Sequence, residues 1–389
     1  MKKIRYLIIG DANSMHIYNY VKTVLVPRNM EIHLLTLSTL PIRKEYRDYY
    51  EEKGIFIHSI SEKGYKNLNK KDILHRGLQL FEKMLLMMDV PKVDICHVHS
   101  VYKTSMYMIR LFRFKFQKLI LSYWGGDIED LTPSVIKLRE QCFKMASSIT
   151  VTVKRTKEQF QELYGHKYDS KLHICRFATA GLECIRSIQK TMTRMQCRDV
   201  YHIPKGKICI TCGYSAYEAQ HQDICLKQIG KLPVELKKQL YVVIPMQYGR
   251  FDLEYIDRVK KNAREANVSY EILEEYVSFR ESAMLAIATD IYLHVRDTDA
   301  FSNALKEHIY ASSIVIKGDW LVYRELDEMH ADVKSISSLE QIAEMLTKVI
   351  KENDCIKRDI VLFEPIYQLY SIQNIVSQWN YIINKTLEV

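Results

Sequence analysis

Short runs of apolar and β-branched residues alternate with longer amphipathic stretches along the whole chain. Runs of the first kind predict β-strands, and amphipathic stretches predict α-helices. Because helical stretches separate the strands, we expect parallel sheets built from β–α–β units, the doubly wound α/β class. The expected strands of the first half are Arg5–Ile9, Glu31–Leu35, Ile55–Ser59, Val93–His99, Leu119–Tyr123, Ser148–Val153 and Leu172–Arg176. Those of the second half are Lys207–Cys212, Leu240–Pro245, Tyr270–Leu273, Asp290–Val295 and Ser313–Ile316.

The alternation stops over residues 186–205, where mixed polar residues and Pro204 show no apolar period. We interpret this stretch as a linker between two Rossmann-like domains, residues 1–185 and residues 206–365. Such domains bind ligands at the carboxyl ends of their strands, so we expect a ligand cleft where the two sheets face each other. Residues 366–389 have a helical pattern with Trp379, and its apolar surface is large enough to dock across a domain boundary.

Length and composition restrict the class of protein. The chain has 389 residues, of which 47% are hydrophobic and 26% charged, enough for two or three domains with proper cores. Its uncharged apolar runs are shorter than the ~18 residues that span a bilayer, so we expect no transmembrane helix. The start of the sequence lacks a signal-peptide pattern, and nine cysteines without framework spacing fit a reducing compartment. We therefore expect a cytoplasmic protein.

Positive charge is concentrated in the first half of the chain. The formal net charge is +9; residues 1–200 contain 34 Lys and Arg against 20 Asp and Glu (+14), and the remainder contains 22 against 27 (−5). A basic half favours an anionic partner such as a membrane surface, although a solvated lysine-rich surface has the same composition. The stretch Tyr102–Phe116 interleaves aromatic, apolar and basic residues as an interfacial helix does, and an ordinary crossover helix is the alternative. No nucleic-acid-binding module is recognisable, so we expect no nucleic acid partner.

Two motifs follow or form strands of the first half. Gly10–His16 comes directly after the first strand, where glycine permits a tight turn and helix N–H groups can hold an anion; an ordinary strand-to-helix turn is the alternative. His97 and His99 lie on one face of an expected strand because side chains alternate. A zinc site at this spacing lacks further ligands in the sequence, so sheet packing or a place in the cleft is the preferred interpretation.

A third motif, Tyr123–Asp127, ends a strand with aromatic residues, two glycines and a carboxylate. Trp124 offers a flat face for a sugar ring, and Gly125 allows a ligand to approach the backbone closely. Asp127 would place a carboxylate in the cleft. In the alternative interpretation Gly125 belongs to a plain turn and Asp127 caps the helix that follows.

The richest constellation is Val295–Glu307, where a strand runs into a loop with Asp299 and a helix begins near Ser302. The free N–H groups at that helix start can hold a diphosphate. Glu307 lies eight residues after Asp299, on the helix, where its carboxylate can accept hydrogen bonds from a ribose diol. Asp299, ahead of the helix, is placed to meet a transferred sugar. A solvated glutamate on a helix surface is the commoner explanation of such a pattern.

This constellation resembles the motif of GT-B glycosyltransferases similar to glycosyltransferase family 4, in which seven residues separate an acid from a glutamate. Tyr123–Asp127 and Gly10–His16 resemble N-terminal-domain motifs of the same group, and the C-terminal helix resembles one that returns to the N-terminal domain. The resemblance implies two Rossmann-like domains facing across a cleft and sugar transfer from a nucleotide sugar with retention of configuration. The catalytic residues that we expect are Asp299, Glu307 and Asp127. The expected donor-binding residues are Gly213, Tyr214, Tyr248, Arg296, Phe301, Ser302, Asn303 and Glu307, and the expected acceptor-binding residues are Asn13, His16, Trp124, Gly125 and Asp127.

Two features depart from the family pattern. The first acid is Asp299 where a glutamate is usual, and the segment Gly213–His221 lacks the Arg/Lys pair that normally neutralises the donor diphosphate. A leaving nucleoside diphosphate needs positive charge or hydrogen-bond donors. The candidates for that role are Arg296, Arg250, Lys317 and His221. The second half is also distantly similar to bacterial 4-acetamido-4,6-dideoxygalactose transferases, which favours a surface-polysaccharide pathway.

The hypothesis that follows is transfer of a sugar from a nucleotide sugar to a hydroxyl of a lipid-linked saccharide, without metal or cofactor. The only D-x-D pattern in the donor region, Asp297–Asp299, falls in the position of the acid pair. A sugar-nucleotide 2-epimerase of the same two-domain layout and a non-enzymatic binding protein with a basic surface remain as alternatives. We expect a cytoplasmic enzyme with peripheral attachment to the inner face of the cell membrane.

Overall fold

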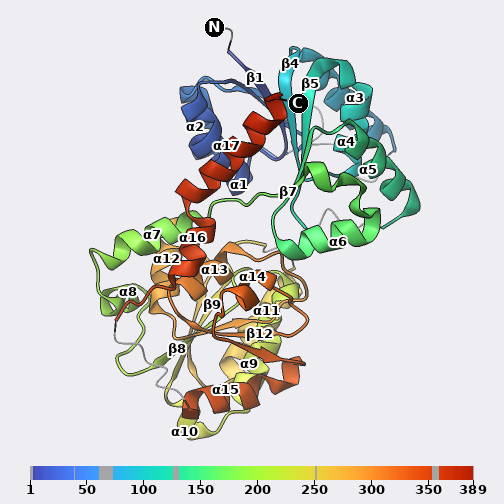
Figure 1. Ribbon diagram of the computed structural model, residues 1–389. Helices are drawn as coiled ribbons and strands as arrows, with labels where there is room; N and C mark the ends of the chain where they lie inside the picture. Colours follow the sequence, from blue (N-terminus) through green and yellow to red (C-terminus); the bar gives the residue numbers. More distant parts are fainter. Residues whose placement is uncertain are drawn as a thin grey trace. The chain divides into compact units, whose positions relative to one another are not determined.

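The structure is a computed structural model that describes residues 3–38, 40–60, 73–125, 131–249, 252–352 and 359–388, with the side chains of residues 73–79 left aside. The chain divides into two compact units, Met1–Ala178 together with Ile372–Val389, and Thr179–Ser371 (Figure 1). Each unit contains its own parallel sheet with helices on both faces, so the expected doubly wound α/β class is confirmed. No helix of the described segments is long and apolar enough to cross a membrane.

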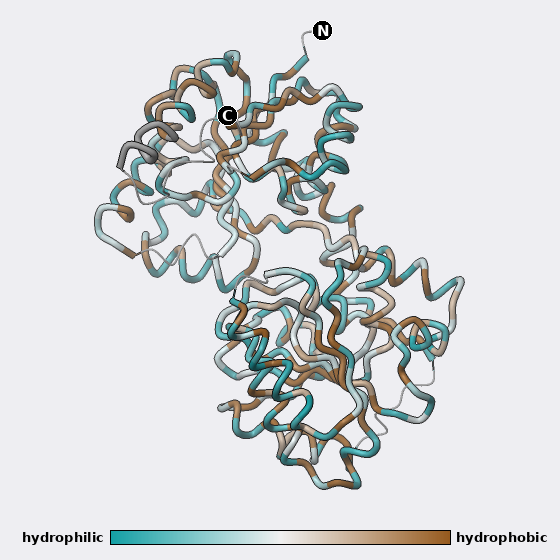
Figure 2. Tube along the Cα trace, turned by 180° about the vertical axis from the view of Figure 1, so that it is seen from behind, coloured by the Kyte–Doolittle hydropathy of each residue, from teal (hydrophilic) through white to brown (hydrophobic). Residues whose placement is uncertain are grey.

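The N-terminal unit contains a seven-stranded sheet in the order β3-β2-β1-β4-β5-β6-β7. Neighbouring strands run parallel; Tyr6 of β1, for example, stands opposite Ile32 of β2 and Ile95 of β4. The central strands are buried on both faces, which explains why their sequences are nearly continuous apolar runs (Figure 2). The strands are β1 (Arg5–Ile9), β2 (Glu31–Thr36), β3 (Phe56–Ser59), β4 (Val93–His99), β5 (Phe116–Tyr123), β6 (Ser148–Val151) and β7 (Leu172–Ile174).

Helices cover both faces of this sheet. One core cluster joins the strands to α3, α4, α5 and α6, with residues such as Met87 of α3 and Phe143 of α5. The cluster on the other face joins the strands to α1, α2 and α17, with residues such as Tyr50 of α2 and Trp379 of α17. The helices are α1 (Met15–Tyr20), α2 (Lys44–Glu52), α3 (Ile73–Asp89), α4 (Lys103–Leu111), α5 (Pro133–Met145), α6 (Lys154–Tyr164) and α17 (Ile372–Glu388).

The C-terminal unit contains a six-stranded parallel sheet in the order β10-β9-β8-β11-β12-β13. Helices α9, α11 and α15 pack on one face of the sheet through one core cluster, and α12 packs against α7, α8 and α13. The strands are β8 (Ile208–Cys212), β9 (Leu240–Pro245), β10 (Ser269–Leu273), β11 (Ile291–His294), β12 (Ile314–Gly318) and β13 (Val333–Ile336). The helices are α7 (Ala180–Gln189), α8 (Arg194–Val200), α9 (Gln222–Gly230), α10 (Val234–Lys237), α11 (Leu253–Glu265), α12 (Phe279–Ala288), α13 (Asn303–Tyr310), α14 (Arg324–Glu328), α15 (Ile342–Glu352) and α16 (Glu364–Tyr370).

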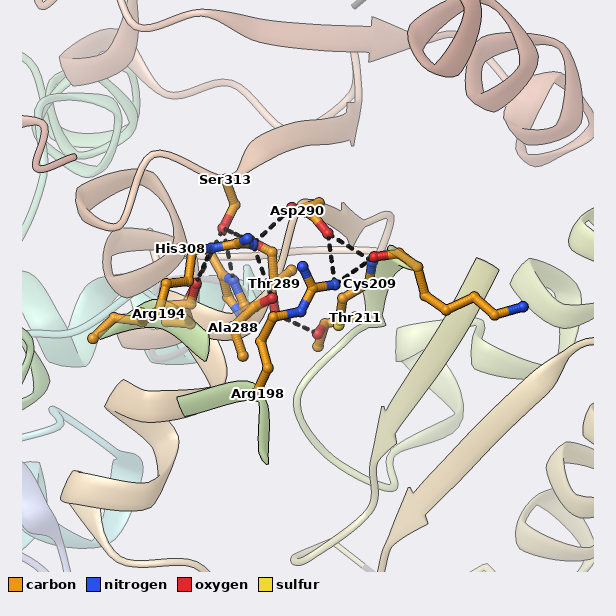
Figure 3. Close-up of polar contacts among 12 residues, drawn as sticks. Arg194, Arg198, Cys209, Thr211, Ala288, Thr289, Asp290, His308 and Ser313 are labelled. Carbon is orange, nitrogen blue, oxygen red and sulfur yellow. Dashed lines mark hydrogen bonds and ion pairs between the residues drawn. The ribbon is translucent and has the colours of Figure 1, made fainter. Parts of the chain in front are cut away.

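The stretch 186–205, interpreted as a linker, differs in the structure: it holds the end of α7 and all of α8 and belongs to the C-terminal unit. The reason is an ion pair that the sequence hides. Arg194 and Arg198 of α8 point inward and bind the buried Asp290 carboxylate at 2.6 and 3.2 Å, as Figure 3 shows. The same carboxylate accepts the Cys209 backbone N–H (2.7 Å) at the start of β8. Two arginines that look like solvated linker residues therefore anchor a helix.

The last helix, α17, belongs to the N-terminal unit although the chain reaches it only after the C-terminal unit. Trp379 is fully buried, its Nε1–H donates to the Arg176 carbonyl (2.9 Å), and its ring packs against Tyr20. Thr386, in the last turn of the helix, forms a hydrogen bond with Ser148 of β6 between their hydroxyls (2.8 Å). A segment nearly 200 residues away in the sequence thus completes one helical layer of this unit.

Candidate functional site

The order in which strands are added to the sheet of the C-terminal unit reverses between β8 and β11. Strands β9 and β10 lie on one side of β8, and β11 to β13 lie on the other. In open α/β sheets, ligands bind at the carboxyl ends of the strands at such a switch point. Gly213 and Tyr214 directly follow β8, and Arg296 comes two residues after the end of β11. The structure therefore brings these three expected donor residues to one place.

Asp299 is the centre of a hydrogen-bond network at this switch point. Its Oδ1 accepts a hydrogen bond from the Arg296 guanidinium (3.1 Å). Its Oδ2 accepts from the Tyr323 hydroxyl (2.9 Å) and from the Ser302 backbone N–H (2.8 Å), and the His294 Nε2 lies 3.2 Å away. The Asp299 side chain is only 3% exposed. The carboxylate is thus held in one position by four groups.

The surroundings of Asp299 keep it ionised. Burial alone raises the pKa of this carboxyl, but the hydrogen bond and charge of His294 and the charge of Arg296 outweigh burial and hold the pKa well below its usual range. The ionised carboxylate in turn orients Arg296, whose guanidinium also donates to the Tyr214 hydroxyl and lies over the Tyr214 ring, 5.4 Å from its centre. A positioned and half-buried cation results.

Helix α13 begins directly after this network. Ser302 is its N-cap residue and its Oγ accepts the Leu305 N–H (3.4 Å). The first N–H groups of a helix have no acceptor within the helix and favour negative charge. One donor beside them, the Ser302 N–H, is already taken by the chain's own Asp299. The Asn303 side chain lies toward the start of α7, where its Oδ1 accepts the Thr179 hydroxyl (3.0 Å).

Glu307 lies on the buried side of α13. Its Oε2 accepts a hydrogen bond from the Ser282 hydroxyl of α12 (3.0 Å), and any side chain at Gly181 of α7 would collide with its Oε1. Burial raises the pKa of this carboxyl to about 7, although the Ser282 hydrogen bond and the charge of Lys306 oppose the change. The alternative of a solvated glutamate is therefore wrong. Near neutral pH the group exists in both protonation states.

Aromatic residues surround the network. The Tyr214 and Tyr248 rings lie 6.3 Å apart, and Tyr248 is 48% exposed, so it is available to stack on a planar ligand. Gly213 adopts a φ of 65°, and a Cβ at this position would lie 2.8 Å from the Gln220 Oε1. Phe301 differs from the others because its ring is buried against Tyr370 in the core.

The four candidate cations have separate positions. Lys317 donates to the carbonyls of Gly318 (3.1 Å) and Leu321 (2.9 Å), and its ammonium holds a loop. His221 pairs with Asp297 through its Nε2 at 2.6 Å. Arg250 lies outside the described residues. Arg296 is the candidate that the structure places in the Asp299 network.

Two expected acceptor residues meet in the N-terminal unit. The His16 ring lies 5.3 Å from the Trp124 ring, edge to face, directly beyond the carboxyl ends of β1 and β5. Gly125 follows with a φ of 125°, which glycine adopts most readily. Asn13 instead ties two loops together, donating to the Pro41 carbonyl (2.9 Å) and accepting a backbone N–H (2.8 Å). Asp127 lies outside the described residues.

His97 and His99 share one face of β4, as expected, with ring centres 3.9 Å apart. His97 is held between the Tyr6 hydroxyl (2.8 Å) and the Ser122 hydroxyl (2.6 Å), which is a sheet-packing role. Neither ring nitrogen of His99 has a hydrogen-bond partner among the described residues, and burial lowers the pKa of His99 to about 3. Its ring lies 5.8 Å from Trp124, so it extends the His16–Trp124 cluster.

Some residues of the site were missed in the sequence. Tyr323 lies in the loop after β12, and the neighbouring residues in the sequence form no motif that indicates its role. Ser282 of α12 and Gly181 of α7 lie next to Glu307, and the sequence around them likewise contains no motif that indicates this. His294 gave one usable signal, since it is a polar residue at the buried end of an apolar strand. In the parts of the chain that the structure describes, no group of three or more His, Cys, Asp and Glu is arranged to hold a metal ion.

Comparison with known protein families gives one match, and it lies in the N-terminal unit. Residues 5–153 match the family described as "Glycosyl transferase 4-like". The match spans β1 to β6 of the N-terminal unit, including His16 and Trp124. A search of curated proteins found no match to the chain.

Solved structures share the fold over the whole chain. A glycosyltransferase from Rickettsia africae is 12% identical with a TM-score of 0.69, covering 100% of both chains. The sucrose-phosphate synthase from Thermosynechococcus elongatus is 10% identical with a TM-score of 0.72, covering 98% of this chain and 99% of its own. HepE from Anabaena, in complex with UDP and glucose, is 9% identical with a TM-score of 0.66, covering 98% and 99%. The family match thus covers residues 5–153 of the N-terminal unit, and the chain as a whole has the two-domain GT-B fold of these structures.

Proposed function

We propose that the protein transfers a sugar from a nucleotide sugar to a hydroxyl of a lipid-linked saccharide, and that the C-terminal unit binds the donor at its switch point. The observation that carries the donor site is the buried Asp299 carboxylate, which holds the Arg296 guanidinium close to the start of α13. A fixed guanidinium and the N–H groups of a helix start both favour a diphosphate.

The proposed reaction develops negative charge at this place. The bond between the anomeric carbon and the diphosphate oxygen breaks, and the acceptor oxygen bonds to the same carbon. The nucleoside diphosphate leaves with the electron pair of the broken bond, and the acceptor hydroxyl loses its proton to the departing phosphate. Arg296 is positioned in advance to offset that charge. On the resemblance noted above, we expect retention of configuration at the anomeric carbon.

Glu307 is the proposed ligand of the nucleotide ribose. A carboxylate offers about four acceptor sites, so the hydrogen bond from Ser282 leaves room for the two ribose hydroxyls. The rings of Tyr214 and Tyr248 offer aromatic surface for the base or the sugar, and Gly213 connects Tyr214 to β8. Ser302 and Asn303 would contribute the backbone of the helix start, and Phe301 supports it from the core.

The acceptor is assigned to the N-terminal unit. The Trp124 and His16 rings supply a flat apolar face beside a polar edge, which suits a saccharide. Gly125 and Asn13 lie in the adjoining loops, and Asp127 is the proposed carboxylate at the acceptor hydroxyl. The distant likeness to 4-acetamido-4,6-dideoxygalactose transferases supports an acceptor saccharide that belongs to a surface-polysaccharide pathway.

Nucleotide binding tests the donor site directly. We expect UDP to bind more tightly than GDP, TDP or CDP, because HepE forms complexes with UDP and with UDP-glucose on the same fold. Arg296→Ala should weaken UDP binding roughly 10- to 100-fold, the loss of one charge-assisted hydrogen bond. Isothermal titration calorimetry with each nucleotide measures this.

The matched control is Arg264→Ala, which removes an exposed arginine of α11 in the same unit. It should bind UDP as the unmodified protein does. Equal UDP affinity of the Arg296→Ala variant, or no binding of any nucleotide, would contradict the donor site. Conversion of the nucleotide sugar to its 2-epimer without acceptor would instead favour the epimerase.

A further inference from the structure

Helix α3 exposes a stripe of large apolar side chains. Phe81, Leu85 and Met88 recur at intervals of four and three residues and therefore lie on one side of the helix. All three are exposed, while Met87 faces the core. In an ordinary helix on the surface of a soluble domain these outward positions are polar.

Helix α4 and the 3-10 helix η3 (Arg113–Lys115) repeat this pattern. Tyr107, Leu111 and Phe114 follow the same spacing and are 51%, 56% and 64% exposed. The opposite side of α4 is buried through residues such as Met106. Exposed apolar side chains scattered singly need no explanation, but two regular stripes do.

The two stripes lie on the same side of the N-terminal unit. Both helices belong to the core cluster that covers one face of the sheet, so their outward sides both point away from it (Figure 1). The Lys115 ammonium joins their ends, since it donates to the carbonyls of Met88 (2.6 Å) and Val90 (2.7 Å). We call the two stripes together the α3–α4 face.

The α4 side of the α3–α4 face is also strongly basic, whereas α3 has Glu82 and Asp89 beside Lys83. Residues 102–118 contain five Lys and Arg and no Asp or Glu. Lys103, Arg110 and Arg113 are exposed. Apolar side chains surrounded by cations are complementary to a surface that has an apolar interior and anionic headgroups.

We propose that the α3–α4 face docks the protein on an anionic membrane surface, with Phe81, Leu85, Met88, Tyr107, Leu111 and Phe114 inserted among the lipid headgroups. This inference rests on the proposed function, in which the acceptor is lipid-linked. Docking through the N-terminal unit would bring the acceptor-binding motifs to the membrane where such an acceptor resides. The stripe on α3 adds an apolar contact that the α4 sequence alone does not reveal.

Vesicle co-flotation tests the proposal. The protein should float with vesicles of phosphatidylcholine mixed with phosphatidylglycerol at low salt, and less so with phosphatidylcholine alone. Lys103→Glu with Arg110→Glu should weaken binding roughly 30-fold or more, because each basic residue near an anionic surface supports binding about five-fold. Leu111→Gln with Phe114→Gln should weaken it roughly ten-fold or more through lost apolar insertion.

Matched controls separate this surface from overall charge. Lys22→Glu with Lys44→Glu makes the same change in net charge on the other face of the same sheet, and should leave vesicle binding nearly unchanged. Equal loss in the control variant, binding that ignores the anionic lipid, or self-association in place of vesicle binding would overturn the proposal. UDP affinity measured on the same variants keeps the two hypotheses apart, since vesicle binding does not depend on the donor site.

Discussion

At Glu307 a carboxylate is buried between α12, α13 and the first turn of α7, with one hydroxyl as its hydrogen-bond donor. Burial disfavours the ionised form and raises the pKa of the Glu307 carboxyl to about 7. Burying a charge with so few partners opposes folding, so the group has to be explained by something other than stability. The role in holding the ribose that we propose for Glu307 provides that explanation.

The Glu307→Gln variant separates the two effects. In the unfolded chain this carboxyl titrates near its usual value of about 4.5, so between that pH and 7 only the folded state holds the proton and stability falls as the pH rises. The penalty is complete above pH 7 and amounts to on the order of 3 kcal/mol. We therefore expect Glu307→Gln to unfold at higher urea concentration than the unmodified protein at pH 8, with a difference that shrinks toward pH 5.

The same variant should bind UDP more weakly, roughly 10-fold or more, because the amide accepts fewer hydrogen bonds than the carboxylate. Higher stability together with weaker nucleotide binding identifies a functional residue. Glu307→Gln with unchanged UDP affinity would remove Glu307 from the site, and a pH-independent stability difference would contradict the raised pKa.

At the scale of elements, α8 shows how a polar sequence forms a buried helix. Its two arginines lie against Asp290 at the junction of α12 and β11. The Arg194 guanidinium also donates to the Ala288 carbonyl at the end of α12 (2.9 Å), and that of Arg198 donates to the Lys207 carbonyl (2.5 Å). In a stretch without apolar periodicity, arginines are expected to be solvated, and the sequence therefore predicts a linker. Asp290, the residue that makes the arginines buried, is about 90 residues away in the sequence.

Asp290→Ala should destabilise the C-terminal unit by about 3–5 kcal/mol, because it leaves two buried guanidinium groups without a counter-charge. Urea unfolding monitored by circular dichroism measures the loss. Lys190→Ala, at the exposed end of α7, is the control and should change stability by no more than about 0.5 kcal/mol. A loss for Asp290→Ala as small as that of the control would mean that the ion pair does not anchor α8.

Strands show a related contrast. Ile208–Cys212 and Leu240–Pro245 were predictable because continuous burial demands continuous apolar sequence. Val333–Ile336 was missed, since this edge strand has four residues and only Ile336 is buried. A short strand with one covered residue has too little contrast between its faces to be recognised.

At the scale of the whole molecule, α17 makes the N-terminal unit discontinuous in sequence. Trp379→Ala should destabilise that unit by about 3–5 kcal/mol, because it opens a large cavity beside Tyr20 and leaves the Arg176 carbonyl without its donor. Tyr381→Ala, on the same helix but 59% exposed, should cost less than about 0.5 kcal/mol. Thermal unfolding of both variants distinguishes them, and equal effects would show that α17 does not complete the core.

The local pattern of the sequence determined the class of fold, nearly all the strands and the position of the acid pair Asp299 and Glu307, because these follow from alternation and spacing within a few residues. The tertiary structure decided their chemistry. It brought Tyr323, His294 and Ser282 to those carboxylates and lowered one pKa while raising the other. It also buried the arginines of α8 and placed the apolar stripes of α3 and α4 on one side. Burial and electrostatic environment depend on neighbours distant in sequence, and no local pattern contains them.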